Sequence, residues 1–157
     1  MFKRSEQVDK WFGNISNKNP FSTLFDQWYV CTLAGLMNGK MATPPDAKEF
    51  IGDFTNDYQP SRRIILGLLV VAEMKKHEIS GKDREDIQKL LDKLIDPDSQ
   101  SKLTDEGFDR LNKYSYGGFC FLQESYPEKP SSPEDFLQYF CNKLEEWDVH
   151  ASGLKIQ

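Results

Sequence analysis

Few residues of this sequence have the types and spacing that catalysis or metal binding requires. The two histidines, His77 and His150, lie among charged residues, and neither has a cysteine or carboxylate at metal-ligand spacing. A cysteine or serine nucleophile would need one of these histidines beside it, and the apolar neighbours of Cys31 are typical of an unreactive thiol. We therefore interpret both histidines as surface residues, and we predict no catalytic residue, no metal site and no cofactor.

Acidic residues offer a second kind of chemistry. Most of them alternate with lysine and arginine, as Glu85 and Lys89 do, which is typical of a solvated helix face. Asp26, Asp53 and Asp57 differ because they stand beside aromatic residues, and a pair of catalytic carboxylates needs apolar surroundings. These three residues are the basis of an enzyme hypothesis. For Asp26 a helix cap or an ion pair is the alternative interpretation, and we predict that the protein is not an enzyme.

Two pairs of basic residues flank the most apolar segment. Arg62 and Arg63 stand at its start, where the dipole of a helix disfavours positive charge. They either pair with acids such as Asp57, or bind phosphate or an acidic partner surface with help from the helix N-terminus. Lys75 and Lys76 form a second basic spot at the other end. Together the four residues define an alternative function, a DNA-contacting helical module or regulator.

Composition narrows the classes of protein that fit. The chain has 157 residues, a formal net charge of −5 and 13% aromatic residues, which suits one domain with a core of large rings. The negative charge argues against indiscriminate nucleic-acid binding, because that affinity comes mainly from neutralised phosphates. Cys31, Cys120 and Cys141 lack metal-ligand spacing and fit reduced thiols. The longest apolar run, Ile64–Ala72, is shorter than the roughly 20 residues that span a bilayer. We expect a cytoplasmic protein with no membrane partner.

The elements that must position these residues are predicted to be helices. The segment Pro20–Gly39 has large apolar side chains on nearly every side, so other helices must surround it. In Ser61–Lys76, residues Ile64, Leu68 and Val71 follow at helical spacing, and we prefer a helix there to a buried strand. Thr43-Pro44-Pro45-Asp46 and Ser132-Pro133-Glu134-Asp135 have the pattern of capping boxes. The sequence predicts helices at Ser5–Phe12, Pro20–Gly39, Thr43–Phe54, Ser61–Lys76, Ser80–Pro97, Thr104–Leu122 and Ser132–Trp147.

We expect these helices to form one domain over residues 1–157. Short loops between amphipathic segments predict an all-α fold, a compact single-domain bundle of about six or seven helices. Residues 1–18 are expected as an N-terminal arm, and residues 148–157 as a tail that frays. Gly117 and Gly118 lack the setting of a phosphate loop. They are interpreted as small residues that allow another helix to approach closely or allow a kink.

Two of these motifs also resemble a known family. Asn19-Pro20-Phe21 precedes the helix through Leu33-Ala34-Gly35-Leu36, and Tyr114-Ser115-Tyr116-Gly117-Gly118-Phe119 follows much later. In order and rough separation they resemble the small helical dnd system-associated proteins of bacterial DNA-phosphorothioation restriction loci. The resemblance covers about a third of the chain, and the long apolar helix at Ile64 and the extended C-terminal portion depart from it. It implies a cytoplasmic accessory component of an anti-phage defence locus, and it carries over no catalytic residue.

Together these observations predict a non-enzymatic interaction subunit of a prokaryotic defence complex. Its partner would be a larger protein subunit of that complex, with DNA reached through the complex. Aromatic residues are favoured at the centres of interfaces, so we assign partner binding to the outer rings Trp11, Phe12, Tyr58 and Trp147. The alternative is that all four belong to the core.

Overall fold

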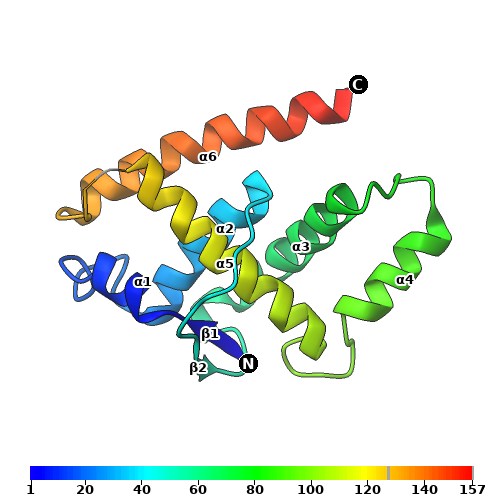
Figure 1. Ribbon diagram of the computed structural model, residues 1–157, viewed down its shortest axis with the longest axis horizontal. Coiled ribbons are helices and arrows are strands. Elements are labelled where there is room, and N and C mark those ends of the chain that lie inside the picture. Colours follow the sequence, from blue (N-terminus) through cyan, green and yellow to red (C-terminus); the bar gives the residue numbers. More distant parts are fainter. Residues whose placement is uncertain (127, 157) are drawn as a thin grey trace.

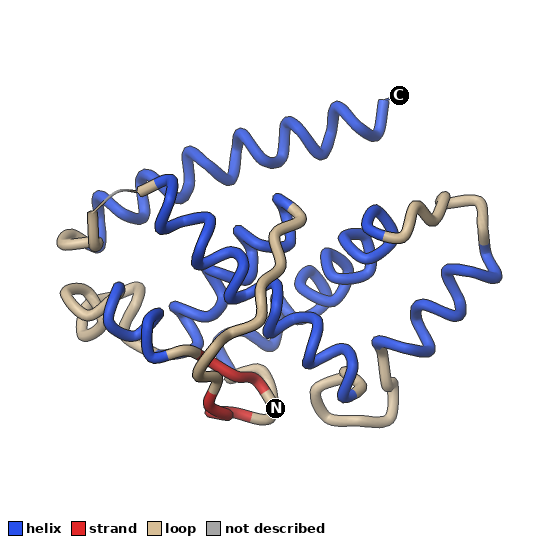
Figure 2. The backbone as a smooth tube through the Cα atoms, viewed as in Figure 1, coloured by secondary structure: helices blue, strands red, loops and turns tan. Residues whose placement is uncertain are grey.

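The fold is mostly helical, as the sequence predicts. The computed structural model describes the backbone of residues 1–126 and 128–156 and the side chains of residues 1–126 and 128–148. Within this part the chain forms six α-helices, one 3-10 segment (Asn56–Ser61) and one two-stranded sheet (Figures 1 and 2). The helices are α1 (Glu6–Trp11), α2 (Leu24–Asn38), α3 (Arg62–Lys76), α4 (Arg84–Leu94), α5 (Asp105–Ser125) and α6 (Pro133–Ile156).

Helix α2 runs through the middle of the molecule and crosses α5 at close range (Figure 1). Thr23 caps its first turn, and Gly39 ends it in the left-handed conformation, with φ of 63°. At the crossing, a Cβ atom on Gly35 would overlap the carbonyl oxygen of Tyr114, and one on Gly118 would overlap that of Cys31. Glycine therefore lets the two backbones touch. For Gly118, this confirms the interpretation that a small residue there allows another helix to approach closely.

The N-terminal residues form a small sheet that the sequence analysis missed. Strand β1 (Phe2–Arg4) pairs antiparallel with β2 (Lys48–Ile51). The helix predicted over Thr43–Phe54 is therefore wrong. Asp46, the acidic residue of the supposed capping box, instead accepts a hydrogen bond from the Ser5 hydroxyl at 2.6 Å. The backbone of the segment is paired with a strand more than forty residues away in the chain.

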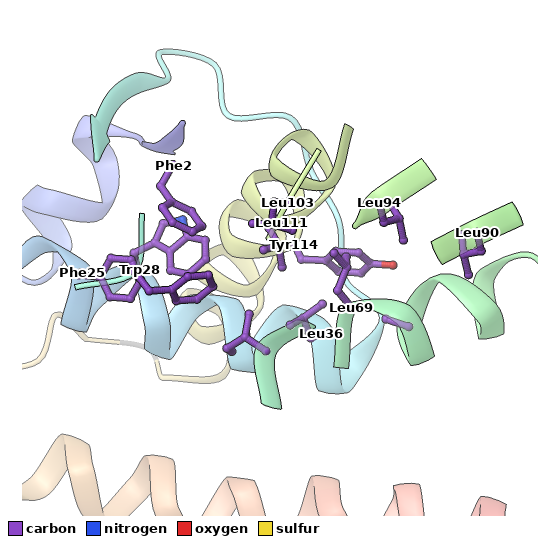
Figure 3. Packing of buried hydrophobic residues seen from close by; sticks show 13 residues of the cluster. Phe2, Phe25, Trp28, Leu36, Leu69, Leu90, Leu94, Leu103, Leu111 and Tyr114 are labelled. Atoms are coloured by element: carbon purple, nitrogen blue, oxygen red, sulfur yellow. The ribbon is translucent and has the colours of Figure 1, made fainter. Parts of the chain in front are cut away.

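Two apolar clusters lie on either side of α2. The first joins α2, α3, α4, α5 and the sheet, and Figure 3 shows its rings gathered at Phe2 and Trp28, whose centroids are 4.6 Å apart. The second lies beneath α1 and α6. Its buried members are Val8, Trp11, Phe12, Ile15, Phe21, Val30, Cys31, Ala34, Phe119, Leu122, Phe136, Phe140 and Trp147.

The N-terminal end of the chain extends this packing. Residues 1–18, expected as an N-terminal arm, contribute the buried side chains of Phe2, Phe12 and Ile15. The tail expected at residues 148–157 continues α6 to Ile156, and its side chains after Asp148 lie outside the described residues. None of the described helices combines the length and the apolar character that crossing a membrane requires.

Candidate protein-interaction surface

Three of the four rings assigned to partner binding are in the core. Trp11 is 3% exposed, Phe12 0% and Trp147 5%. Trp11 packs edge-on against Phe136, with centroids 5.7 Å apart, and Trp147 packs edge-on against Phe140 at 5.8 Å. The expectation that these rings lie on the outside is therefore wrong, because α6 packs onto the second cluster, covers Trp11 and Phe12 with Phe136, and places its own Trp147 in the cluster.

The fourth ring, Tyr58, is half-buried and belongs to the cap of α2. The Asp26 carboxylate accepts hydrogen bonds from the Thr23 amide at 2.8 Å and the Thr23 hydroxyl at 2.7 Å, and a third from the Tyr58 hydroxyl. Burial, together with the hydrogen bond to Asp26, raises the pKa of Tyr58 above its usual range, so the phenol stays protonated and donates. The helix-cap interpretation of Asp26 is confirmed.

The other residues considered for catalysis or metal binding are dispersed. Asp53 accepts a hydrogen bond from the Phe54 amide at 2.7 Å, and Asp57 is exposed. His77 is exposed as predicted, while the side chain of His150 lies outside the described residues. In the described part of the chain, no three histidine, cysteine or acidic side chains are grouped so that they could hold a metal ion.

The arginine pair stands at the first turn of α3. Arg62 is half-buried and donates hydrogen bonds to the Gln59 side chain at 3.0 Å and to the Gln100 carbonyl at 3.2 Å. Arg63 is exposed. Among the described residues neither arginine forms an ion pair, so the proposed partnership with Asp57 is absent from this structure. Arg62 is thus held at the surface by neutral groups, and both arginines keep their charge available.

The lysine pair stands at the last turn of the same helix. Lys75 and Lys76 are both exposed, and the Lys76 ammonium lies 3.3 Å from the sulfur of Met41. Because α3 has 15 residues and a helix rises about 1.5 Å per residue, the two basic pairs are separated by roughly 20 Å. They are two spots at opposite ends of one helix and not a single cluster.

Between these two basic spots lies an apolar row that is partly in solvent. Ile64 is 57% exposed and Val71 is 45% exposed, whereas Leu68 between them is half-buried and packs against the first cluster. We call these three residues the α3 stripe. The neighbouring side of the helix packs into the first cluster through Ile65 and Leu69, which are both fully buried. Helix α3 therefore has aliphatic residues on two sides, and among the described residues only one of these sides is fully buried.

An open groove lies at the C-terminal end of α3. Its volume is about 570 Å³, and it is bounded by Ala72, Lys75 and Lys76 of α3 and by the C-terminal end of α2, while none of the three stripe residues lines it. Met37 and Met41 form part of its walls, and methionine adapts easily to different apolar partners. The full lining comprises Leu36, Met37, Asn38, Gly39, Met41, Ala72, Lys75, Lys76 and Tyr114.

The charge of this surface is set by the direction in which Glu73 points. Glu73 is the only acid in α3, and it is 1% exposed. Arg110 Nε lies 3.2 Å from its carboxylate, close enough for an ion pair but without hydrogen-bond alignment. The Tyr114 hydroxyl donates to it at 3.0 Å, and burial raises the pKa of Tyr114, which keeps that hydroxyl protonated. Figure 3 shows Tyr114 directed from α5 toward α3. The outer face of α3 is consequently basic, although the whole chain has a net charge of −5.

The stripe is the feature that the sequence analysis did not recognise as a surface. The spacing of Ile64, Leu68 and Val71 was identified, but nothing in it distinguishes a covered face from an exposed one. A usable signal was the second aliphatic row, Ile65 and Leu69, on the same helix.

Comparison with protein-family models, with curated proteins and with solved structures gives no match for this chain.

Proposed function

We propose that this protein is a non-enzymatic accessory subunit of a prokaryotic anti-phage defence complex, and that it binds a larger protein subunit through the outer face of α3. One observation carries the interaction role: the α3 stripe leaves Ile64 and Val71 exposed on one face of a helix, with the half-buried Leu68 between them. Single exposed apolar residues are ordinary, whereas apolar residues that adjoin one another on a surface are typical of a binding site. The defence assignment rests on the resemblance at residues 19–21 and 114–119.

The acidic residues support binding in preference to catalysis. Asp26 is used by the cap of α2, and Glu73 by an internal ion pair with Arg110. Neither carboxylate lines the groove beside α3, whose polar groups are two lysines, one asparagine and the ring of Tyr114. Such a set holds a ligand by charge and apolar contact and offers no acid–base pair.

A DNA-contacting role is the second candidate. It is favoured by the lack of ion pairs at Arg62, Arg63, Lys75 and Lys76 among the described residues. The row of aliphatic side chains between them fits a phosphate backbone poorly, because nucleic-acid contacts are mainly with charged oxygens. Binding to duplex DNA at about 50 mM salt that weakens steeply as salt is raised would support this candidate over the first.

Affinity purification of the tagged chain from its native host tests the proposal. The wild type should enrich a nuclease, ATPase or DNA-modifying subunit, and the double variant Ile64→Ser/Val71→Ser should lose it. Leu24→Ser is the matched control, because Leu24 is 39% exposed on another helix. Equal enrichment by all three proteins would overturn the assignment to α3. An enriched partner with no part in DNA restriction or modification would overturn the defence role.

A further inference from the structure

The α3 stripe has the shape that a second helix would require. Its residues are spaced four and three apart, so they form one straight ridge about 10 Å long. Beyond Val71, at the C-terminal end of this ridge, an open groove lies between the last turn of α3 and the end of α2. Helices pack by placing the ridge of one into the groove of the other. A ridge with an open groove at one end therefore suits an amphipathic helix that lies along α3.

The charges at the ends of the stripe define the chemistry of that helix. Arg63 is exposed one residue before Ile64, and Lys75 is exposed four residues after Val71. Glu73, which could have neutralised them, points into the core. A partner helix that reaches along the whole stripe would therefore place its two ends beside positive charges. Acidic residues at both ends would be attracted there, and basic residues would be repelled.

A second copy of this chain is a poor occupant for the same reason. An antiparallel pair of α3 helices would place Arg63 of one copy against Lys75 of the other. A parallel pair would place the two copies of Arg63 together. Each arrangement brings like charges into contact, and each copy also has a net charge of −5. Like-charge contacts of this kind select against a wrong partner.

These observations point to one occupant. We infer that the α3 stripe and its groove bind an amphipathic helix of a different protein, whose apolar face has acidic residues at both ends. The inference rests on the proposed function and specifies the chemistry of the partner. The apolar face would cover Ile64, Leu68 and Val71, and the acidic ends would lie beside Arg63 and Lys75.

Two synthetic helical peptides test the inference with the full-length protein. Both have the same leucine row at helical spacing, one with glutamates at each end and the other with lysines at the same positions. We expect fluorescence anisotropy to show at least tenfold tighter binding of the glutamate peptide. The double variant Arg63→Glu/Lys75→Glu should reverse this preference, because it reverses both end charges.

Matched variants separate the apolar contact from the charges. Ile64→Ser/Val71→Ser should weaken binding of the glutamate peptide about tenfold or more, since two exposed aliphatic contacts are removed. Lys18→Glu is the charge control, because Lys18 is exposed in a loop away from α3. It should leave the peptide preference unchanged. Circular dichroism of each variant should match the wild type, because every substituted side chain is at least partly exposed.

Each other outcome counts against the inference. Equal binding of both peptides, or binding of neither, would overturn the acidic chemistry of the partner. Concentration-dependent dimerisation that Val71→Ser abolishes would assign the stripe to a second copy. Duplex DNA binding that needs Arg63 and Lys75 but tolerates Val71→Ser would assign the surface to nucleic acid.

The failure of this inference and the failure of the proposed function give different results. If the native partner is still lost from the stripe variant while the peptides fail to bind, the proposed function stands and only the partner chemistry is wrong. If the glutamate peptide binds as expected while the native partner has no part in DNA restriction or modification, the partner chemistry stands and the defence role is wrong.

Discussion

The α2–α5 crossing and helix α3 both have apolar surface to bury, and they differ in how much of it is buried within this chain. At the crossing, Gly35 and Gly118 remove side chains so that two backbones meet, and the residues around them are buried. Helix α3 instead has aliphatic side chains on two sides, and in the part of the chain that the structure describes only one of these sides is fully buried. The crossing is complete within this chain. The outer face of α3 is exposed, and a second protein could cover it.

The two sides of α3 should therefore respond very differently to the same substitution. Leu69→Ala should lower the free energy of unfolding by about 2–5 kcal/mol, because it leaves a cavity at a fully buried site. Val71→Ala, at a site 45% exposed, should change it by less than about 0.5 kcal/mol. Urea denaturation measures both. A comparable loss at Val71 would show that the stripe is packed within this chain and is not available to a partner.

Substitution at the crossing should give the next largest change in the free energy of unfolding. The Cβ atom of Gly118→Ala would overlap the backbone oxygen of Cys31, and a backbone atom cannot rotate away. The helices must separate, so we expect a loss of about 1–3 kcal/mol of unfolding free energy, as for other overpacked sites. Alanine has the higher helix propensity by about 1 kcal/mol, so any increase in stability would contradict the close contact. Thermal unfolding of the variant decides the sign.

Local sequence signals predicted most helices well. The Thr104 and Ser132 caps and the glycine at the end of α2 were recognised from a few adjacent residues, and they appear in the structure. The sheet was missed because β1 and β2 are far apart in the chain, and no short segment shows that pairing. Asp46 illustrates the difficulty: its position suits a helix cap, yet its partner, Ser5, comes from the N-terminal segment.

The interaction surface was harder to predict than the helix that bears it. The aliphatic pattern of α3 predicts the helix, but Ile64 and Ile65 are equally apolar, and only the tertiary packing decides which is covered. The same limit explains Trp11. A short amphipathic helix shows that its tryptophan lies on an apolar side, but not that Phe119 and Phe136 from distant helices enclose it.

A smaller change on α3 sharpens the contrast with the crossing. Gly67 is exposed in the middle of the helix, and a Cβ atom there would meet nothing within 4 Å. Gly67→Ala should therefore raise the unfolding free energy by about 0.5–1 kcal/mol through helix propensity alone. The same substitution would thus destabilise the protein at Gly118 and stabilise it at Gly67. A loss at Gly67 in chemical denaturation would show that the outer face of α3 is more closely packed than its exposure indicates.

Thiol labelling tests the same comparison with the smallest change to the protein. Cys31 lies at the crossing, where burial raises its pKa well above the usual range, so its thiol should be neutral and shielded at pH 8. Cys141 is exposed on α6. Ellman's reagent should modify Cys141 rapidly in the native protein, and Cys141→Ser should remove that fast phase. Cys31 should react only when the crossing opens, so Gly118→Ala should accelerate its modification while Val71→Ala should not. Rapid labelling of Cys31 in the wild type would mean that α2 and α5 separate readily, and the contrast between a closed crossing and an open α3 face would no longer hold.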